Sequence, residues 1–358
     1  PADSSLPLRF ENPVARESLT GLATNGNGNN APPLRDQITL DLGALGSATY
    51  LRDLSGPQPR VLRGAIGLGL SGGESAPLPV QGVAANISQG KVDVDAWEDV
   101  LTQATTAEPP ARTAPATAAT PSTSGPAMAQ DYLPTTLALR ANRLTLEGRT
   151  FNRVVVGGSR EGTQWRANVN ADELNGYVEV RQAGPNTAGS VFARLARLKL
   201  EPTVATDVEQ LLSQPTSVPA LDIAVDELQV ANRRLGRIEI EAINRASGAR
   251  SSEWRLTQLN LSLPEARLSA TGNWAALGAP AGGGAAGQRR TALNFRLDID
   301  DSGQLLARFG REGLVRGGKG RIEGSIGWIG SPLALDYPTL SGQLQADFER
   351  GQFLKVEP

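Results

Sequence analysis

Apolar and polar residues alternate one by one along most of this chain. Between Thr291 and Asp300, for example, Leu293, Phe295, Leu297 and Ile299 are each separated by a polar residue. A repeat of two residues places all the apolar side chains on one face of a β-strand and all the polar ones on the other. Similar runs recur at Leu137–Leu139, Ile223–Val225, Ile238–Ile240, Leu259–Leu261–Leu263 and Leu340–Leu344–Phe348. With glycine turn signals between them, these runs predict roughly sixteen to eighteen strands.

Helices are predicted to be few and short. The candidates are Asp95–Leu101, where Asp95 is the expected cap, Thr206–Ser213 and Ser302–Phe309. None is long enough or regularly placed enough to form the crossovers of a parallel doubly wound sheet. The sequence therefore predicts an all-β fold.

Composition divides the chain into three parts. Residues 101–131 are rich in Ala, Thr and Pro and lack apolar periodicity, so we predict a disordered linker there. Residues 1–100 are predicted to be an N-terminal β segment, and residues 132–358 a repeated β-meander. The repeat units are expected at about 133–200 and 218–274, followed by C-terminal strands at 289–358.

The two predicted repeat units share a plan. Each begins with a Leu-Pro or Val-Pro pair, continues as an alternating strand, a glycine turn and a second strand, and reaches a tryptophan, Trp165 or Trp254. The turns are expected at Gly148–Arg149 in the first unit and at Leu235–Gly236–Arg237 in the second. A repeated meander indicates an elongated sheet that grows in one direction.

Two absences argue against catalysis. The chain has no cysteine and no histidine, which excludes thiol nucleophiles and thiolate metal sites and removes the usual general acid–base. The net charge is −2 and aromatic residues make up only 4%, so no nucleic-acid partner is expected. We predict a protein that is not an enzyme and has no cofactor, no catalytic residues and no metal site.

Two glycine-rich motifs resemble nucleotide-binding loops. Gly67–Gly72 has the spacing G-x-G-x-x-G, but prolines follow where a phosphate-binding helix should begin. Gly313–Lys319 resembles a P-loop, but Gly320 replaces the hydroxyl residue that would bind magnesium. Both are better explained as glycine-rich strands and turns.

Acidic residues cluster at two places. Asp93, Asp95, Glu98 and Asp99 lie close together but lack the glycine and the terminal glutamate of a calcium loop, so helix capping is the favoured explanation. Asp298, Asp300 and Asp301 are interpreted as a solvated strand end.

No apolar run is long enough for a transmembrane helix, and no signal peptide is visible at Pro1–Phe10. The chain starts and stops abruptly, with Pro358 directly after the strand-like Gln352–Val356, and is interpreted as a fragment of a longer protein. Its five tryptophans are expected to pack within the sheet.

An apolar strand face is usually the core of a sandwich. With so few helices to cover it, this face requires a partner or a ligand.

Several segments resemble the YhdP-type proteins of the AsmA-like family, which is similar to TamB and to bridge-like lipid transfer proteins. They are Gly90–Trp97, the units around Trp165 and Trp254, Gly303–Gly310, Gly327–Pro332, Tyr337–Gly342 and, most specifically, Gly351–Pro358. The resemblance implies an elongated, curled antiparallel β-sheet that forms an open apolar groove (a β-taco). It further implies a periplasmic protein whose parent is anchored in the inner membrane.

The implied function is a non-catalytic lipid-transfer conduit that carries phospholipid between the inner and outer membranes of a Gram-negative envelope. Its partners would be phospholipid and the remainder of the parent protein. The alternative is a structural or adhesive β-sandwich or solenoid with a closed core. The residues expected to line the groove are Leu137, Leu139, Ile223, Val225, Ile238, Ile240, Leu261, Leu263, Leu293, Phe295, Leu297 and Leu344.

Overall fold

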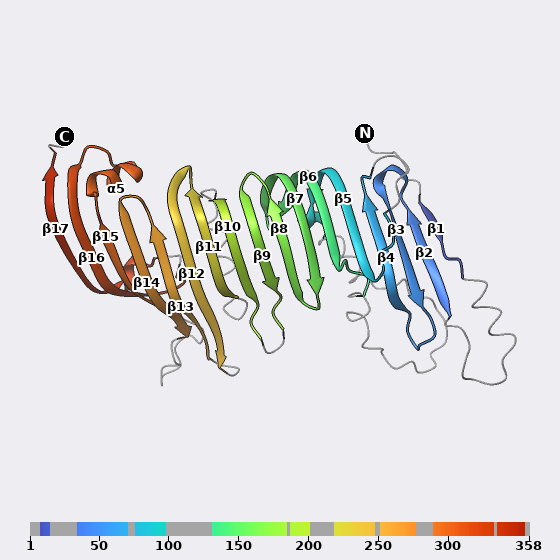
Figure 1. Cartoon of the computed structure of the whole chain (residues 1–358). Helices are drawn as coiled ribbons and strands as arrows, with labels where there is room; N and C mark the ends of the chain where they lie inside the picture. Colours follow the sequence, from blue (N-terminus) through green and yellow to red (C-terminus); the bar gives the residue numbers. More distant parts are fainter. Residues whose placement is uncertain are drawn as a thin grey trace. The chain divides into compact units, whose positions relative to one another are not determined.

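The computed structural model describes residues 8–14, 34–70, 76–97, 131–184, 187–200, 218–247, 251–276, 289–332 and 335–354. These contain seventeen strands that belong to one sheet, with short helices at only a few places (Figure 1). The predicted all-β fold is confirmed. The chain divides into two compact units, Pro1–Gly162 with Val169–Asp172, and Thr163–Asn168 with Glu173–Pro358.

The first unit contains seven strands that pair in the order of the sequence. They are β1 (Arg9–Glu11), β2 (Arg35–Asp41), β3 (Gly46–Asp53), β4 (Arg60–Leu68), β5 (Gly82–Asp93), β6 (Thr136–Leu146) and β7 (Arg149–Glu161), with the short helix η1 (Gly43–Leu45) before β3. The residues of β8 (Gln164–Asn170) are divided between the two units.

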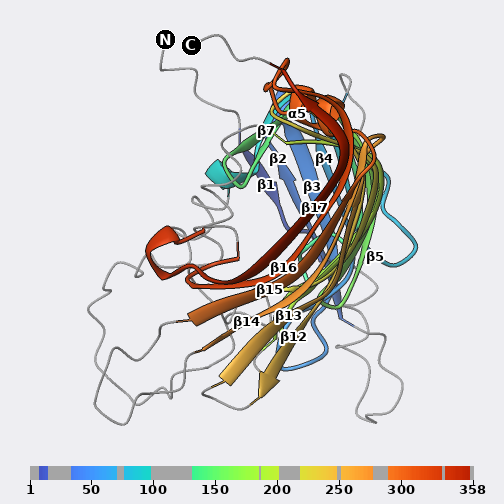
Figure 2. The ribbon, with the colours of Figure 1, turned by 90° about the vertical axis from the view of Figure 1, so that its left-hand side faces the viewer.

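The second unit also pairs its strands in sequence order, and its sheet is curled along the strands (Figure 2). The strands are β9 (Leu174–Arg181), β10 (Ser190–Leu200), β11 (Ala220–Val230), β12 (Arg233–Ser247), β13 (Ser251–Ser262), β14 (Ala266–Ala276), β15 (Arg289–Ile299), β16 (Val315–Ile329) and β17 (Ser341–Phe353). The helix α5 (Ser302–Arg308) precedes β16, and η2 (Tyr337–Thr339) precedes β17.

Most neighbouring strands are antiparallel, but three pairs are parallel: β4–β5, β5–β6 and β10–β11. A parallel neighbour requires the chain to return to the end from which it started, which a tight turn cannot do. Long connections, at residues 69–81, 94–135 and 201–219, precede the second strand of each pair. The first two lie within the first unit and the third within the second.

Two of the predicted helices can be compared with the structure. Ser302–Arg308 is helical, as predicted, and the Asp301 side chain caps it by accepting a hydrogen bond from Gln304 N. Residues 94–97 form one helical turn, but Asp93 rather than Asp95 accepts the bond from Ala96 N (3.2 Å), so the predicted cap was wrong. Thr206–Ser213, the end of the first helix and most of the predicted linker lie outside the described residues.

The two predicted repeat units have the same kind of tight turn after their first strand. Glu147 and Gly148 join β6 to β7, and Ala231 and Asn232 join β11 to β12, with positive φ at all four residues. Two consecutive positive φ values match the right-handed twist of a two-residue hairpin. The turn predicted at Gly236 was therefore wrong. Gly236 lies inside β12, with φ +76°, where an added Cβ would be only 2.2 Å from Ser262 O.

Candidate functional site

The strand register of the second unit aligns the apolar residues of seven strands. Paired residues of adjacent strands project on the same face of a sheet, so continuous rows of partners form continuous stripes of side chains. One row consists of Ile223, Ile240, Leu259, Ala270, Phe295, Gly324 and Leu344. A second row consists of Val225, Ile238, Leu261, Leu268, Leu297, Ile322 and Ala346. We call the face that carries these rows the apolar face.

The opposite face of the same strands is polar and carries ion pairs. Asp298 accepts hydrogen bonds from Arg296 (2.9 Å) and Arg321 (2.7 Å). Arg237 contacts Asp226 (2.6 Å) and Glu239 (2.7 Å). These residues alternate along the strands with those of the apolar rows. The sheet therefore separates a charged, hydrated surface from an aliphatic one.

The apolar face lies on the inner side of the curl. Trp328, on this face, donates a hydrogen bond from Nε1 to Ser331 O (2.9 Å), where the segment that carries η2 begins. Figure 2 shows that segment on the inner side of the bend of β16 and β17. The bend therefore shelters the aliphatic rows, while the charged face lies on the outer side.

Many side chains in the centre of the apolar face remain partly accessible. Leu261, Leu293, Phe295 and Leu297 are neither fully buried nor fully exposed. Leu344, on β17, is 62% exposed. Core residues of a sandwich are covered by the side chains of a second sheet. Among the described residues no second layer covers these rows, so their apolar surface is available to a ligand.

Tryptophans close one end of the apolar rows. Trp254, Trp274, Thr291 and Trp328 are successive partners across β13–β16. The Arg289 guanidinium stacks on the Trp274 ring at 4.2 Å, and burial lowers the pKa of this arginine. Trp274 and Trp328 are almost completely buried. The five tryptophans were predicted to pack within the sheet. Three of them do so in this rim, but Trp97 lies in the helical turn after β5 and is 57% exposed.

The helix α5 closes the other end of the strands. Arg308 contacts the carboxylate of Glu265 at the β13–β14 turn and donates from Nη1 to Arg234 O (2.6 Å) at the β11–β12 turn. Glu265 is only 3% exposed. The hydrogen bond to Glu265 raises the pKa of Arg308. One arginine therefore fastens the helix to two neighbouring hairpin turns.

The first unit has an apolar face of its own. Leu40, Ala48, Ile66, Ala85, Leu137 and Gly158 form one row of partners across β2–β7. At the end of β2 and β3, the buried Asp36 pairs with Arg52 (2.5 Å), which also donates to Tyr132 Oη (3.2 Å). The hydrogen bond to Asp36 raises the pKa of Arg52. Tyr132, which follows the predicted linker, is thereby held at the strand ends.

The structure places the predicted groove residues on apolar faces of both units. Leu137 and Leu139 lie on β6 in the first unit, and the other ten belong to the second unit. Nine of these ten are in cross-strand rows, where Ile223 faces Ile240, Val225 faces Ile238 and Leu261 faces Ile238. Leu263 lies just beyond β13 and is 8% exposed. Their role as a lipid groove remains a prediction.

Several residues of the apolar rows were not predicted from the sequence. Leu268 lies between the predicted Leu261 and Leu297, Ile322 is the partner of Leu297, and Ile326 is the partner of Leu293. Leu268 alternates with Ala266 and Ala270, a weaker signal than alternating leucines. Along β16, Gly324 stands between Ile322 and Ile326 and interrupts the aliphatic pattern of that strand. Period-two counting that accepts alanine and glycine at apolar positions finds all three.

The acidic clusters have structural roles in the described residues. Asp95 accepts hydrogen bonds from Glu147 N (2.7 Å) and Gly148 N (2.8 Å), so it holds the β6–β7 turn. Asp298 joins the Arg296–Arg321 ion pairs, and Asp301 caps α5. Glu98 and Asp99 lie outside the described residues. No cluster suited to a metal ion occurs in the described ranges.

The ion pairs of the polar face predict an acid-dependent loss of stability. Hydrogen bonds from Arg296 and then Arg321 lower the pKa of the Asp298 carboxyl below its ordinary value of 3.8. Since the folded pKa is the lower one, the contribution is complete above pH 3.8 and is lost as pH falls through the folded value. We expect thermal unfolding scans to show a decline in Tm below about pH 4 that Asp298→Asn reduces. An unchanged acid profile in this variant would contradict the assignment.

One comparison with known proteins identifies the chain. The family model described as YhdP protein matches residues 2–358. No curated protein matches the chain. Within the described ranges, no helix has the length and apolarity needed to cross a membrane. With an all-β sheet whose strands each have one apolar face, and a family match over nearly the whole sequence, this chain belongs to the YhdP family.

Proposed function

We propose that this chain is a non-catalytic segment of a lipid conduit, in which phospholipid acyl chains lie against the apolar face. The observation that carries the proposal is the continuity of the aliphatic rows from β11 to β17. These rows cross the strands, so acyl chains in contact with them would meet no buried charge from one strand to the next. The proposed setting is the periplasm, between the inner and outer membranes, with a parent protein anchored in the inner membrane.

The energetic argument concerns the acyl chains alone. Exposing the roughly thirty methylenes of a diacyl lipid to water costs on the order of 25 kcal/mol of free energy, at roughly 0.8 kcal/mol each. A sheltered aliphatic surface removes most of that cost. The head group needs no specific contact, because it can remain in water at the open side of the curl. This explains how a protein without histidine or cysteine could move lipid without chemistry.

The partial exposure of the rows favours the conduit over a structural sandwich. A closed core would require a second layer against Leu261, Leu293 and Leu297, and the described residues contribute none. Phe348 of β17 is 58% exposed, as an open surface requires. Gly320 lies under the ring of Phe348, where an added Cβ would be 2.3 Å from a ring carbon. The ring therefore packs against the glycine of its own sheet rather than against a second layer.

Native mass spectrometry of the full chain, purified without detergent, tests the proposal. We expect mass additions that correspond to phospholipid, and we expect the delipidated chain to extract labelled phospholipid from liposomes. Lipid-free spectra together with no extraction from liposomes would contradict the conduit and would favour the structural alternative.

A further inference from the structure

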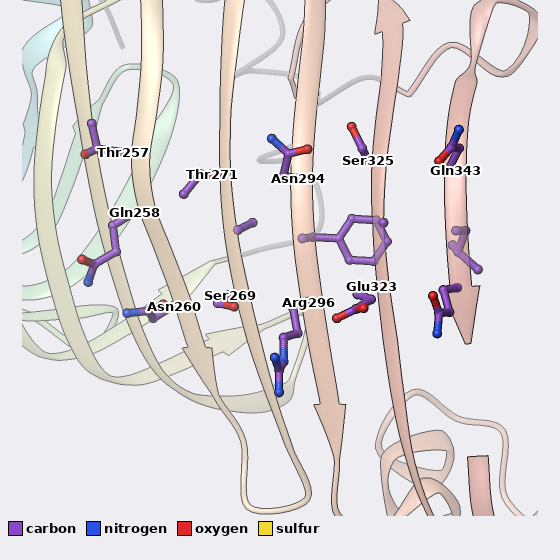
Figure 3. A pocket seen from close by; sticks show the side chains of 15 residues that line it. Thr257, Gln258, Asn260, Ser269, Thr271, Asn294, Arg296, Glu323, Ser325 and Gln343 are labelled. Atoms are coloured by element: carbon purple, nitrogen blue, oxygen red, sulfur yellow. The ribbon is translucent and has the colours of Figure 1, made fainter. Parts of the chain in front are cut away.

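The polar face of the second unit contains a hollow of about 840 Å³ that spans β13–β17 (Figure 3). Two rows of polar side chains form it. Asn260, Ser269, Arg296, Glu323 and Gln345 are successive partners in one row. Thr271, Asn294, Ser325 and Gln343 are successive partners in the other. The row between them also lines the hollow, and its members there are Ala270, Phe295, Gly324 and Leu344. The short side chains of Ser269, Thr271 and Ser325 leave the centre open.

The side chains in the centre of this hollow are not engaged with the protein. Ser269, Thr271, Asn294, Ser325 and Gln343 make no side-chain hydrogen bond to any described residue. Figure 3 shows these short polar groups spread across adjacent strands. This differs from the rest of the polar face, where arginines pair with aspartates and glutamates. The hollow is therefore a mainly neutral patch, with free donors and acceptors, on a face that is otherwise charged.

Charge at the hollow disfavours a polyanion. The guanidinium of Arg296 is held by Asp298 at 2.9 Å. Glu323, its cross-strand partner, attracts Arg296 electrostatically but forms no ion pair in the described part of the chain. A phosphate or sulfate polymer would meet a carboxylate that is not neutralised, together with an arginine that is already occupied. A neutral ligand would meet neither penalty.

We propose that this hollow binds an uncharged, hydroxyl-rich chain, that is, a glycan strand. Carboxamides and hydroxyls each donate and accept hydrogen bonds, as sugar hydroxyls do, so they can pair with a glycan in several orientations. Glu323 can accept from hydroxyl groups. The five strands span roughly 19 Å, which accommodates several sugar units. The Phe295 side chain belongs to the apolar rows, so the polar rows rely on hydrogen bonds rather than on ring stacking.

Calorimetric titration of the full chain tests the proposal with three probes: the β-1,4-linked hexamers of N-acetylglucosamine and of glucose, and dextran sulfate. We expect binding of at least one neutral hexamer and none of dextran sulfate. The double variant Thr271→Val with Asn294→Leu is expected to weaken binding about tenfold, because two hydrogen-bonding side chains are removed. Thr136→Val, an exposed threonine on β6 in the first unit, is the matched control and should change nothing.

The lipid proposal and this one concern opposite faces of the sheet, so they fail separately. The double variant should retain its Tm and its bound phospholipid. Absence of binding by both neutral hexamers, binding that survives the double variant, or stronger binding of dextran sulfate would each overturn the glycan proposal.

Discussion

Replacement of Leu261 by arginine is expected to remove bound phospholipid while the chain stays folded. Leu261 lies in the centre of an apolar row between Ile238 and Leu268, and it is partly exposed. A guanidinium there would have to be desolvated by an acyl chain, which costs several kcal/mol. In the lipid-free protein, the long arginine side chain can reach water across the open face. Native mass spectrometry should show lipid occupancy reduced by about tenfold or more, for a penalty above roughly 1.4 kcal/mol.

Gln258→Arg is the matched control for this experiment. Gln258 lies three residues away on the same strand but on the polar face, where its cross-strand partner is Glu241. An arginine at that position gains an acidic neighbour and should leave both Tm and lipid occupancy unchanged. If Leu261→Arg instead unfolds the chain, the apolar rows are a closed core and the conduit proposal fails. If the variant retains its lipid, acyl chains do not lie on these rows.

Removal of the Arg308 side chain is expected to have the largest effect on stability. Glu265 is 3% exposed and would be left as an unpaired, buried carboxylate. The loss of one partner from a buried pair typically costs 3–5 kcal/mol, and because Arg308 is itself partly exposed we expect about 3 kcal/mol for Arg308→Ala. For a unit of this size that corresponds to a decrease of roughly 6–12 °C in Tm, measurable by differential scanning calorimetry.

Two further variants separate the charge from simple packing. Adding Glu265→Gln to Arg308→Ala removes the uncompensated charge and should recover part of the lost Tm. Arg311→Ala, at an exposed arginine just beyond α5, should have no measurable effect. If the double variant is less stable than Arg308→Ala alone, the carboxylate of Glu265 is satisfied by other groups and the role given to Arg308 is wrong.

A closed rim at each end of the strands and an accessible centre would suit a carrier better than a rigid scaffold. The row that contains Trp254, Trp274 and Trp328 packs at one end of the strands, and Arg308 fastens α5 to the hairpin turns at the other end. These contacts hold strand ends that would otherwise fray. The middle of each strand contributes its aliphatic residues to the inner side of the curl. Stability and ligand access are thereby assigned to different parts of the same strands. The lipid variants and the Arg308 variants should consequently affect different measurements.

The sequence by itself determined that this is a β-protein and which side chains share a face. Alternation along one strand is a local property, because successive residues of a strand point to opposite sides whatever lies next to it. Leu293, Phe295 and Leu297 were therefore assigned to one face without any knowledge of their neighbours. The helix at Ser302–Arg308 was also predicted, but Asp301, interpreted from the sequence as part of a solvated strand end, is the cap of this helix.

Only the tertiary structure decided which strands are neighbours and in what register. The parallel pairs, the position of Gly236 inside β12 and the role of Asp95 at a turn some fifty residues away depend on hydrogen bonds between distant segments. The polar hollow likewise takes its residues from five strands, and no single strand contains enough of them to reveal it. Alternation fixes the direction of each side chain, whereas long-range backbone pairing decides what that side chain meets.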